Sequence, residues 1–321
     1  MARASGGSPL RVGVSACLLG HAVRHDGGHK RDRFLTDTLG PHVEWVPVCP
    51  ELELGLGVPR EPIRLEGEPQ APRLVAPGSR TDHTRTMARL AHTRTGALAR
   101  LDLDGYVLKK DSPSCGMERV RVHGGRGGPS RAGVGAFARV LMQRLPLLPV
   151  EEEGRLNDPV LRENFVERLF AHQRWREFVA GGPTRGGLVA FHTAHELTLL
   201  AHDPAAYRRL GALVARAKAQ PLRAVLAAYG AGFMAALRVR TTPGRHANVL
   251  EHMLGSFSDA LPTEERRELV EVIADHRRGL VPLIVLLTLM RHHVRRHGVE
   301  YLRGQVYLDP HPTEIMLRNH V

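Results

Sequence analysis

The pattern of hydrophobic and polar positions changes character near the middle of the 321-residue chain. In the first half, short Val-rich runs alternate with segments of helical spacing and with frequent Gly and Pro. The runs 10–16, 43–48 and 105–109 predict strands, and 82–101 and 135–145 predict helices. This alternation is typical of α/β domains with three layers. We therefore expect a Rossmann-like three-layer domain with a largely parallel sheet over residues 10–147.

The second half has a helical pattern throughout, and no strong strand signal interrupts it. Asp158 before Pro159 predicts a capped helix start, because Pro is favoured at the first helical position. Further helical patterns follow at 188–201, 207–219, 222–239, 246–257, 263–278 and 283–297. We expect an all-α helical domain over 158–321, a linker at 148–157 and a disordered N-terminus at 1–9.

The three cysteines of the chain occupy similar places, each where a predicted strand gives way to a turn: Cys17, Cys49 and Cys115. Because the carboxyl ends of parallel strands meet at one edge of a sheet, the three thiols can converge there. Three thiolates at one point hold a metal or an iron–sulfur cluster and leave one coordination position open. Two alternatives stay open, which are a zinc ion with three Cys ligands and water, or three small core residues.

Polar side chains lie close to these cysteines in sequence. Glu51 follows Cys49 by two residues, where it can act as a general acid or base, or simply as a helix N-terminal charge. Ser112 and Ser114 can donate hydrogen bonds to a substrate or stabilise a turn. Nearby basic side chains either balance the charge of a thiolate cluster or are solvated: Arg60, Lys109 and Lys110.

The formal net charge of +12 and the pI near 10.5 favour a polyanionic partner. Nearly all of the positive charge is Arg, so a compositional bias of the genome explains it equally well. The Gly- and Arg-rich stretch 121–131, which contains Arg126, predicts a mobile loop that could contact phosphates.

The chain shows no targeting or membrane signal. Its start lacks the apolar core of a signal peptide, and its longest apolar run, 280–290, is about half of the ~20 residues that span a bilayer. We expect a cytoplasmic protein without a membrane segment, in which the cysteines do not form disulfides.

The helical half is rich in histidine, which raises the question of a second metal site. Without carboxylate partners at fixed spacing, such histidines are expected at a surface or an interface. The residues considered are His192, His195, His202, His246, His252, His276, His292 and His293.

Three cysteine-containing segments resemble the motifs of the thiouracil desulfurases: Val14-Ser-Ala-Cys-Leu-Leu-Gly20, Val48-Cys-Pro-Glu51 and Lys110-Asp-Ser-Pro-Ser-Cys-Gly116. The similarity spans about 10–147, and His25 stands where that family usually has Tyr. The second half resembles the YbgA-like helical domain, most clearly at 246–255 and 301–310. The fusion of the two is similar to the RudS-type desulfidases, which act on 4-thiouridine in tRNA.

The resemblance implies an enzyme that removes sulfur from a thiolated uracil base by non-redox hydrolytic cleavage of the C–S bond. It implies a 4Fe–4S cluster on Cys17, Cys49 and Cys115, with one iron not ligated by protein. The family's catalytic carboxylate maps onto Glu51. Its catalytic serine maps onto Ser112, and the nearby Ser114 is the alternative. Candidate substrate-binding residues are Ser114, Arg60, Lys110 and Arg126.

The sequence is compatible with two substrates and with two other classes of protein. The expected substrate is 4-thiouridine in tRNA, and the alternative is free 2-thiouracil or a similar small thiobase. The chain could instead be an iron–sulfur nucleic-acid-binding regulator or a structural zinc domain. Glu51 and Ser112 beside the cysteines favour an enzyme, because a sensor has no need of an acid–base pair. The sequence makes no prediction of the oligomeric state.

Overall fold

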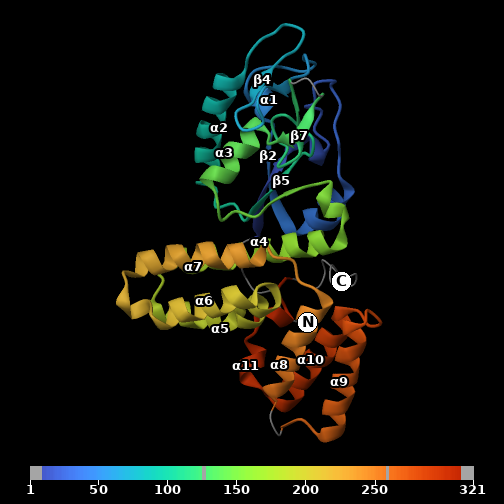
Figure 1. Cartoon of the computed structure of the whole chain (residues 1–321), viewed down its shortest axis with the longest axis vertical. Helices are drawn as coiled ribbons and strands as arrows, with labels where there is room; N and C mark the ends of the chain where they lie inside the picture. The colour runs from blue at the N-terminus through green and yellow to red at the C-terminus, as the bar shows by residue number, and fades with distance from the viewer. Residues whose placement is uncertain (1–8, 125–127, 258–259, 312–321) are drawn as a thin grey trace. The chain divides into compact units, whose positions relative to one another are not determined.

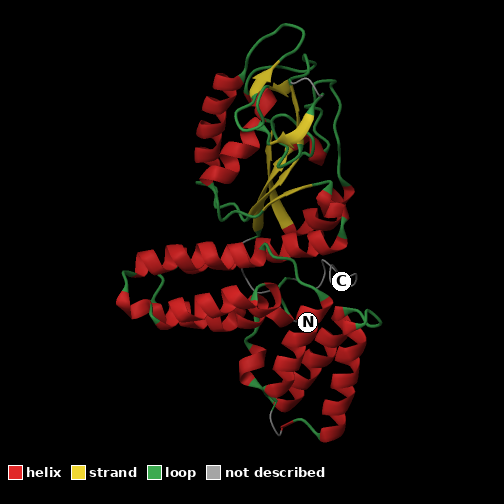
Figure 2. Cartoon of the chain, viewed as in Figure 1, coloured by secondary structure: helices red, strands yellow, loops and turns green. Residues whose placement is uncertain are grey.

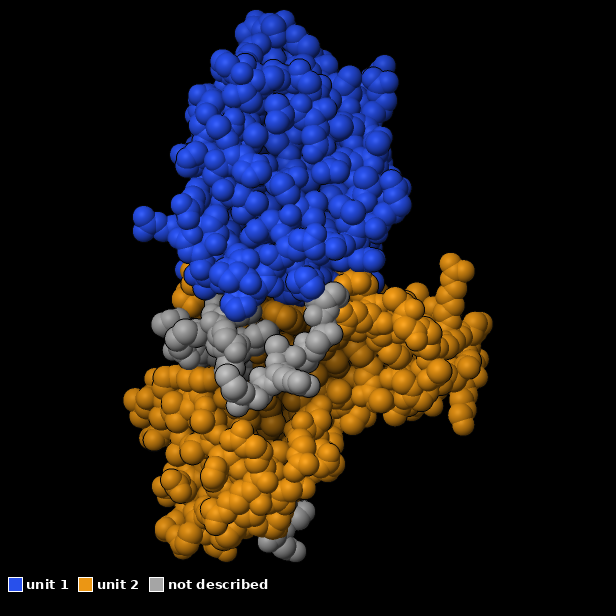
Figure 3. Space-filling model, turned by 180° about the vertical axis from the view of Figure 1, so that it is seen from behind, with its two compact units in different colours: residues 1–157 blue, residues 158–321 orange. Residues whose placement is uncertain are grey.

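The computed structural model describes residues 9–124, 128–257 and 260–311 (Figure 1). The chain divides into two compact units, residues 1–157 and 158–321, which are coloured separately in Figure 3. The first unit contains all the strands among the described residues, and the second is helical (Figure 2). The prediction of an α/β domain followed by an all-helical part is confirmed. Of the helices in these ranges, none combines the length and the apolar character that a bilayer crossing requires.

A parallel four-stranded sheet of order β2-β1-β5-β8 forms the centre of the first unit. Its strands are β1 (Leu10–Ser15), β2 (Val43–Val48), β5 (Gly105–Leu108) and β8 (Val150–Glu152). The first three lie where the Val-rich runs predict them, because β-branched residues fit a buried pleated surface. Two neighbouring helices, α2 (Thr84–Leu98) and α3 (Ala136–Arg144), add buried side chains to this unit's core (Figure 1).

A second sheet, of order β4-β3-β6-β7, was not predicted from the sequence. Its strands are β3 (Arg64–Glu66), β4 (Arg73–Val75), β6 (Val120–His123) and β7 (Ser130–Gly133). Strands of three or four residues are too short to show a reliable period-2 pattern. The prediction of a loop at 121–131 is therefore wrong at both ends of the segment, because these ends lie in β6 and β7, which pair as antiparallel strands. Arg126 lies outside the described residues, as do residues 1–8 of the predicted disordered N-terminus.

The predicted linker at 148–157 differs from the structure, because its middle is strand β8 at the edge of the parallel sheet. The run of three glutamates made a buried strand an unexpected assignment, since buried carboxylates are rare unless they have partners. In this strand, the buried carboxylates of Glu151 and Glu152 do have partners. Glu151 accepts a hydrogen bond from Arg155 Nε at 2.7 Å, and Glu152 accepts one from the backbone N–H of Met117 at 2.7 Å.

Close packing between β1 and β5 leads to a stability prediction. Gly13 lies directly opposite Tyr106, whose ring is fully buried, and a Cβ atom at residue 13 would overlap that ring. We expect Gly13→Ala to lower the free energy of unfolding by about 1–3 kcal/mol, the usual cost of overpacking. Urea unfolding measures the change. Gly96→Ala in α2 is the matched control, since nothing lies within 4 Å of its added Cβ. Equal destabilisation by both variants would contradict the packing argument.

The second unit contains seven helices of twelve or more residues among those described: α4 (Pro159–Ala180), α5 (Arg185–His202), α6 (Pro204–Ala215), α7 (Leu222–Leu237), α8 (Pro243–Gly255), α9 (Thr263–Arg277) and α10 (Leu283–His297). The predicted cap is present at α4, where Asp158 accepts hydrogen bonds from the N–H groups of Val160 and Leu161 at 2.8 and 3.2 Å. Every predicted helical segment is a helix in the structure, with ends shifted by a few residues.

Candidate active site

A cavity of about 380 Å³ lies at the carboxyl end of the parallel sheet. Cys17, Cys49 and Cys115 all line it, each from the segment that follows β1, β2 or β5. The same cavity is lined by Glu51 and Ser112. Segments separated by up to about a hundred residues in sequence therefore meet at one point, as the topology of a parallel sheet favours.

Local structure holds each cysteine in place. Cys17 lies in the short 3₁₀ turn Ala16–Leu19, which ends at Gly20 with φ 94°, a conformation that favours glycine. Cys49 precedes helix α1 (Pro50–Glu53), and its thiol donates a weak hydrogen bond to the carbonyl of Val23 at 3.8 Å. The backbone N–H of Cys115 donates to Ser112 Oγ at 3.0 Å, which fixes the turn before it.

The thiols are neutral in the absence of a bound cation. Burial raises the pKa of Cys17 to about 11 and raises the pKa of Cys49. Burial also raises the pKa of Cys115 well above its ordinary value. A bound metal or cluster reverses this, since a coordinating thiol loses its proton. The donor set therefore fits a thiophilic group and not a hard cation such as Mg²⁺.

The distances between the cysteine sulfur atoms help to distinguish a site for a single metal ion from a site for a cluster. Among the described residues, the three cysteine Sγ atoms do not all lie within 4.8 Å of one another. Thiolates that share one tetrahedral zinc ion, each ~2.3 Å from it, are only about 3.8 Å apart. At least one pair of these sulfur atoms is therefore farther apart than two ligands of one zinc ion, and a larger inorganic group fits such a spacing better.

The carboxylate of Glu51 is held at both of its oxygens. Ser114 Oγ donates to Oε1 at 2.9 Å, and Arg60 donates to Oε2 from Nε at 3.1 Å and from Nη2 at 2.6 Å. Arg60 is itself fixed, because its Nη1 donates to the carbonyls of Val23 and Gly57 at 3.0 and 2.9 Å. The Glu51 and Arg60 side chains are only 15% and 5% exposed. These contacts fix the direction in which the carboxylate faces.

The two serines that the sequence could not distinguish have different surroundings. Ser112 lines the cavity, and its Oγ accepts from the backbone N–H groups of Ser114 and Cys115 at 3.3 and 3.0 Å. Its hydroxyl proton has no acceptor among the described residues, so it can donate into the cavity. Ser114 is fully buried, is not among the cavity-lining residues, and donates to Glu51.

Basic side chains surround the cavity, and some already have acidic partners. Lys109 pairs with Glu153, and Glu153 also accepts from the backbone N–H of Lys110 at 2.7 Å. Arg24 lies 3.5 Å from Asp26. Sequence reasoning did not single out Glu153, or the cavity-lining Lys30, because nothing in the local pattern marks them.

The histidines of the second unit are not mainly at the surface. The expectation is wrong for five of them, which are buried: His192, His195, His202, His276 and His293. His192 Nδ1 lies 3.1 Å from the Tyr229 hydroxyl, and His195 Nδ1 lies 2.7 Å from the carbonyl of Phe191. The Nδ1 atoms of these two histidines therefore have separate hydrogen-bond partners.

Both parts of the chain match known families. Residues 12–153 match the family described as 2-thiouracil desulfurase, and residues 196–312 match the family described as protein of unknown function (DUF1722). Over 153 residues the chain is 33% identical to "Uncharacterized protein YbgA" of Escherichia coli (strain K12). This match covers 47% of this chain and 90% of that protein. The chain is also 30% identical over 153 residues to "Uncharacterized protein YbbK" of Bacillus subtilis (strain 168), covering 45% of this chain and 97% of that protein.

A solved structure is similar to part of the chain. Its title is "[4Fe-4S]-dependent thiouracil desulfidase TudS", and the two sequences are 34% identical. The match covers 46% of this chain and 94% of that one, with a TM-score of 0.39.

Proposed function

Because the chain belongs to the 2-thiouracil desulfurase family and continues into a DUF1722 (YbgA-like) domain, we propose that it removes sulfur from a thiolated uracil base. The observation that carries this proposal is the single cavity lined by three thiols, a carboxylate and a serine hydroxyl. An acid–base group beside a thiophilic centre is what cleavage of a C–S bond needs.

The proposal includes a 4Fe–4S cluster on Cys17, Cys49 and Cys115, with one iron not ligated by protein. The wide spacing of the sulfur atoms supports a cluster over a single zinc ion. When bound, such a cluster supplies an iron that can bind thiocarbonyl sulfur and draw electron density from the C–S bond.

The chain's own residues supply the proton transfers. Glu51 takes a proton from the attacking water, in the direction that Arg60 and Ser114 impose on its carboxylate. Ser112 keeps its proton and donates a hydrogen bond from its hydroxyl group to the base, where negative charge develops. Water replaces sulfur at the carbon, so the thiocarbonyl becomes a carbonyl and sulfide leaves as hydrosulfide. No electrons are exchanged overall, and the reaction needs no nicotinamide or flavin.

We propose 4-thiouridine in tRNA as the substrate. Support comes from Lys30 and Lys110, which line the cavity, are exposed, and make no ion pair with any described residue. Free cations at this position suit a phosphate backbone, whereas a free thiobase carries no phosphate. The net charge of +12 points the same way. A base within folded RNA would have to be extruded to reach the cavity.

The proposal is tested by anaerobic reconstitution of the protein with iron and sulfide, followed by a sulfide-release assay. Two substrates are compared, which are tRNA carrying 4-thiouridine and free 2-thiouracil. We expect a higher kcat/KM on the tRNA. Sulfide release from free 2-thiouracil alone would overturn the proposal of an RNA substrate, but it would support the proposed desulfidase activity. Release from neither, together with cluster-dependent binding to nucleic acid, would favour a regulator.

Salt dependence tests the role of the two lysines. With two or three phosphate contacts, we expect kcat/KM on tRNA to fall about tenfold between ~50 and ~200 mM salt, because binding releases counterions from the RNA and that gain shrinks as the salt concentration rises. Turnover of a free thiobase, where detectable, should change little. The double variant Lys30→Gln/Lys110→Gln should weaken the salt dependence on tRNA. An unchanged slope in that variant would remove these lysines from the proposed contact.

A further inference from the structure

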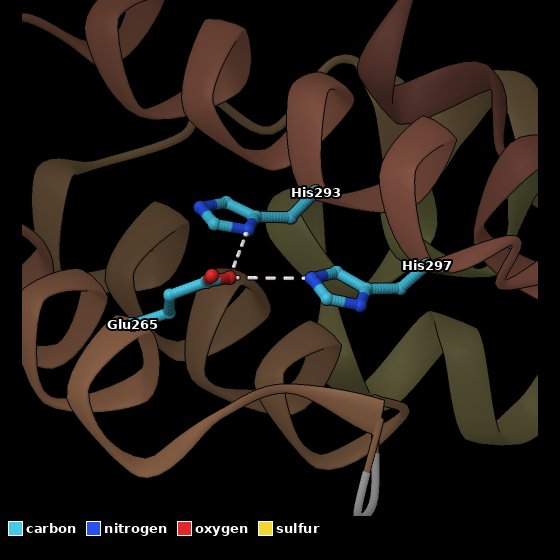
Figure 4. Close-up of side chains that lie close together, drawn as sticks. All are labelled: Glu265, His293 and His297. Carbon is cyan, nitrogen blue, oxygen red and sulfur yellow. Dashed lines mark hydrogen bonds and ion pairs between the residues drawn. The ribbon is translucent and has the colours of Figure 1, made fainter.

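Two helices of the second unit bring together a carboxylate and two histidines, none of which lines the cavity described above (Figure 4). Glu265 lies in the first turn of α9, and His293 and His297 lie one turn apart on α10. Glu265 Oε2 lies 3.1 Å from His293 Nδ1 and 3.2 Å from His297 Nε2. Residues four apart on a helix share a face, which explains why both rings reach one oxygen.

The contact with His293 is close without being a well-formed hydrogen bond. His293 is only 8% exposed, and its Nδ1 has no hydrogen-bond partner of acceptable geometry among the described residues, although Oε2 is near. A buried nitrogen left in this state is unfavourable, because it has lost water and gained no aligned donor or acceptor. A ligand between the three side chains would satisfy it.

The three side chains have the spacing of metal ligands. Their nearest donor atoms all lie within 4.8 Å of one another. Ligand atoms ~2.0–2.1 Å from a tetrahedral zinc ion are about 3.3–3.4 Å apart, close to the two distances from Oε2. Burial lowers the pKa of His293, which favours the neutral imidazole that binds metals.

One nearby cation has to be taken into account. Arg296 Nη1 lies 3.1 Å from the other oxygen of Glu265, Oε1. Its side chain is 56% exposed, so most of its charge is screened by solvent. Arg296 therefore contacts Oε1 and leaves Oε2 to the two histidines.

We propose that Glu265, His293 and His297 bind a divalent transition-metal ion, with zinc the best fit to this ligand set. Two imidazoles and one carboxylate leave a fourth position for water, as in other zinc sites with these ligands. Since the ligands come from α9 and α10, the ion would fasten the two helices together. The site shares no residue with the cysteine-lined cavity, so it does not depend on the proposed desulfidase activity.

Cobalt(II) titration of the full-length, chelator-treated protein tests the site, because cobalt reports its ligands by absorption. Cobalt on thiolates gives intense ligand-to-metal charge transfer, whereas a His/carboxylate site gives only ligand-field bands. We expect one equivalent of the second kind, displaced by zinc. Glu265→Gln and His297→Gln should weaken its binding by about tenfold or more, as expected for lost ligands. His292→Gln, exposed on the same helix, is the matched control and should leave it unchanged.

Two results would overturn the proposal. One is a wild-type titration that shows thiolate-bound cobalt alone. The other is a ligand-field signal that persists in both ligand variants. Circular dichroism of the metal-free proteins shows whether the variants fold, and if they do not, the wild-type spectrum and its displacement by zinc decide the question.

Discussion

Cys49→Ser is expected to abolish sulfide release from a thiolated base and to lower the iron content of the reconstituted protein. The variant removes one of the three thiols that line the cavity, and a neutral hydroxyl is a far poorer ligand for iron than a thiolate. Cys49 suits this test because it is less buried than Cys17 and Cys115, so the fold should survive. Iron and sulfide content, the visible absorption of the cluster and sulfide release are measured together.

The cluster-free protein provides the control for folding. Wild-type and Cys49→Ser chains that have not been reconstituted should show the same circular dichroism and nearly the same thermal unfolding. If Cys49→Ser kept full activity with a full complement of iron, Cys49 would not be a ligand. If it lost activity and kept the iron, its role would lie in the reaction and not in cluster binding.

Glu51→Gln is expected to lower kcat by about 10²–10⁴-fold, the usual contribution of a general acid or base. Iron content should stay near the wild-type value, because the amide keeps the shape of the side chain and no cysteine changes. A second effect follows from the ion pair. The variant leaves Arg60 buried without its carboxylate, which typically costs ~3–5 kcal/mol of stability. Activity must therefore be compared at a temperature where both proteins are folded.

Glu53→Gln is the matched control for this experiment. Glu53 lies on the same short helix and also pairs with an arginine, Arg94 at 3.2 Å, but it does not line the cavity. We expect kcat to stay close to that of the wild type in this variant. A loss of equal size in both variants would assign the effect to the helix and not to the Glu51 carboxylate.

The features that the sequence predicts well are local ones. Each cysteine follows a predicted strand and has a Gly or Pro within the next three residues, so its place at a strand end could be inferred without a structure. The rule that parallel strands end at one edge then brings the cysteines together. The helices of the second unit are long enough for helical spacing to identify them.

The features that the sequence misses depend on pairing between distant residues. The bond from Ser114 to Glu51 joins residues 63 positions apart, and no local pattern marks it. Strand β8 looked polar because its carboxylates are matched by Arg155 and by a backbone N–H that only the fold supplies. The surroundings of Glu265 were missed for the same reason, since it lies 32 positions from His297.

The two partners of Glu51 differ in one respect that bears on each turnover. The guanidinium of Arg60 has donors only, so it cannot turn around to accept a hydrogen bond from a protonated carboxyl group. The Ser114 hydroxyl can, because its O–H rotates and its oxygen has lone pairs. A proton arriving on the carboxylate would therefore settle on Oε1, and the hydroxyl rotor would reverse the sense of that bond. Rotation of the buried Ser114 hydroxyl would then accommodate both the charged and the protonated form of Glu51, without any movement of the backbone.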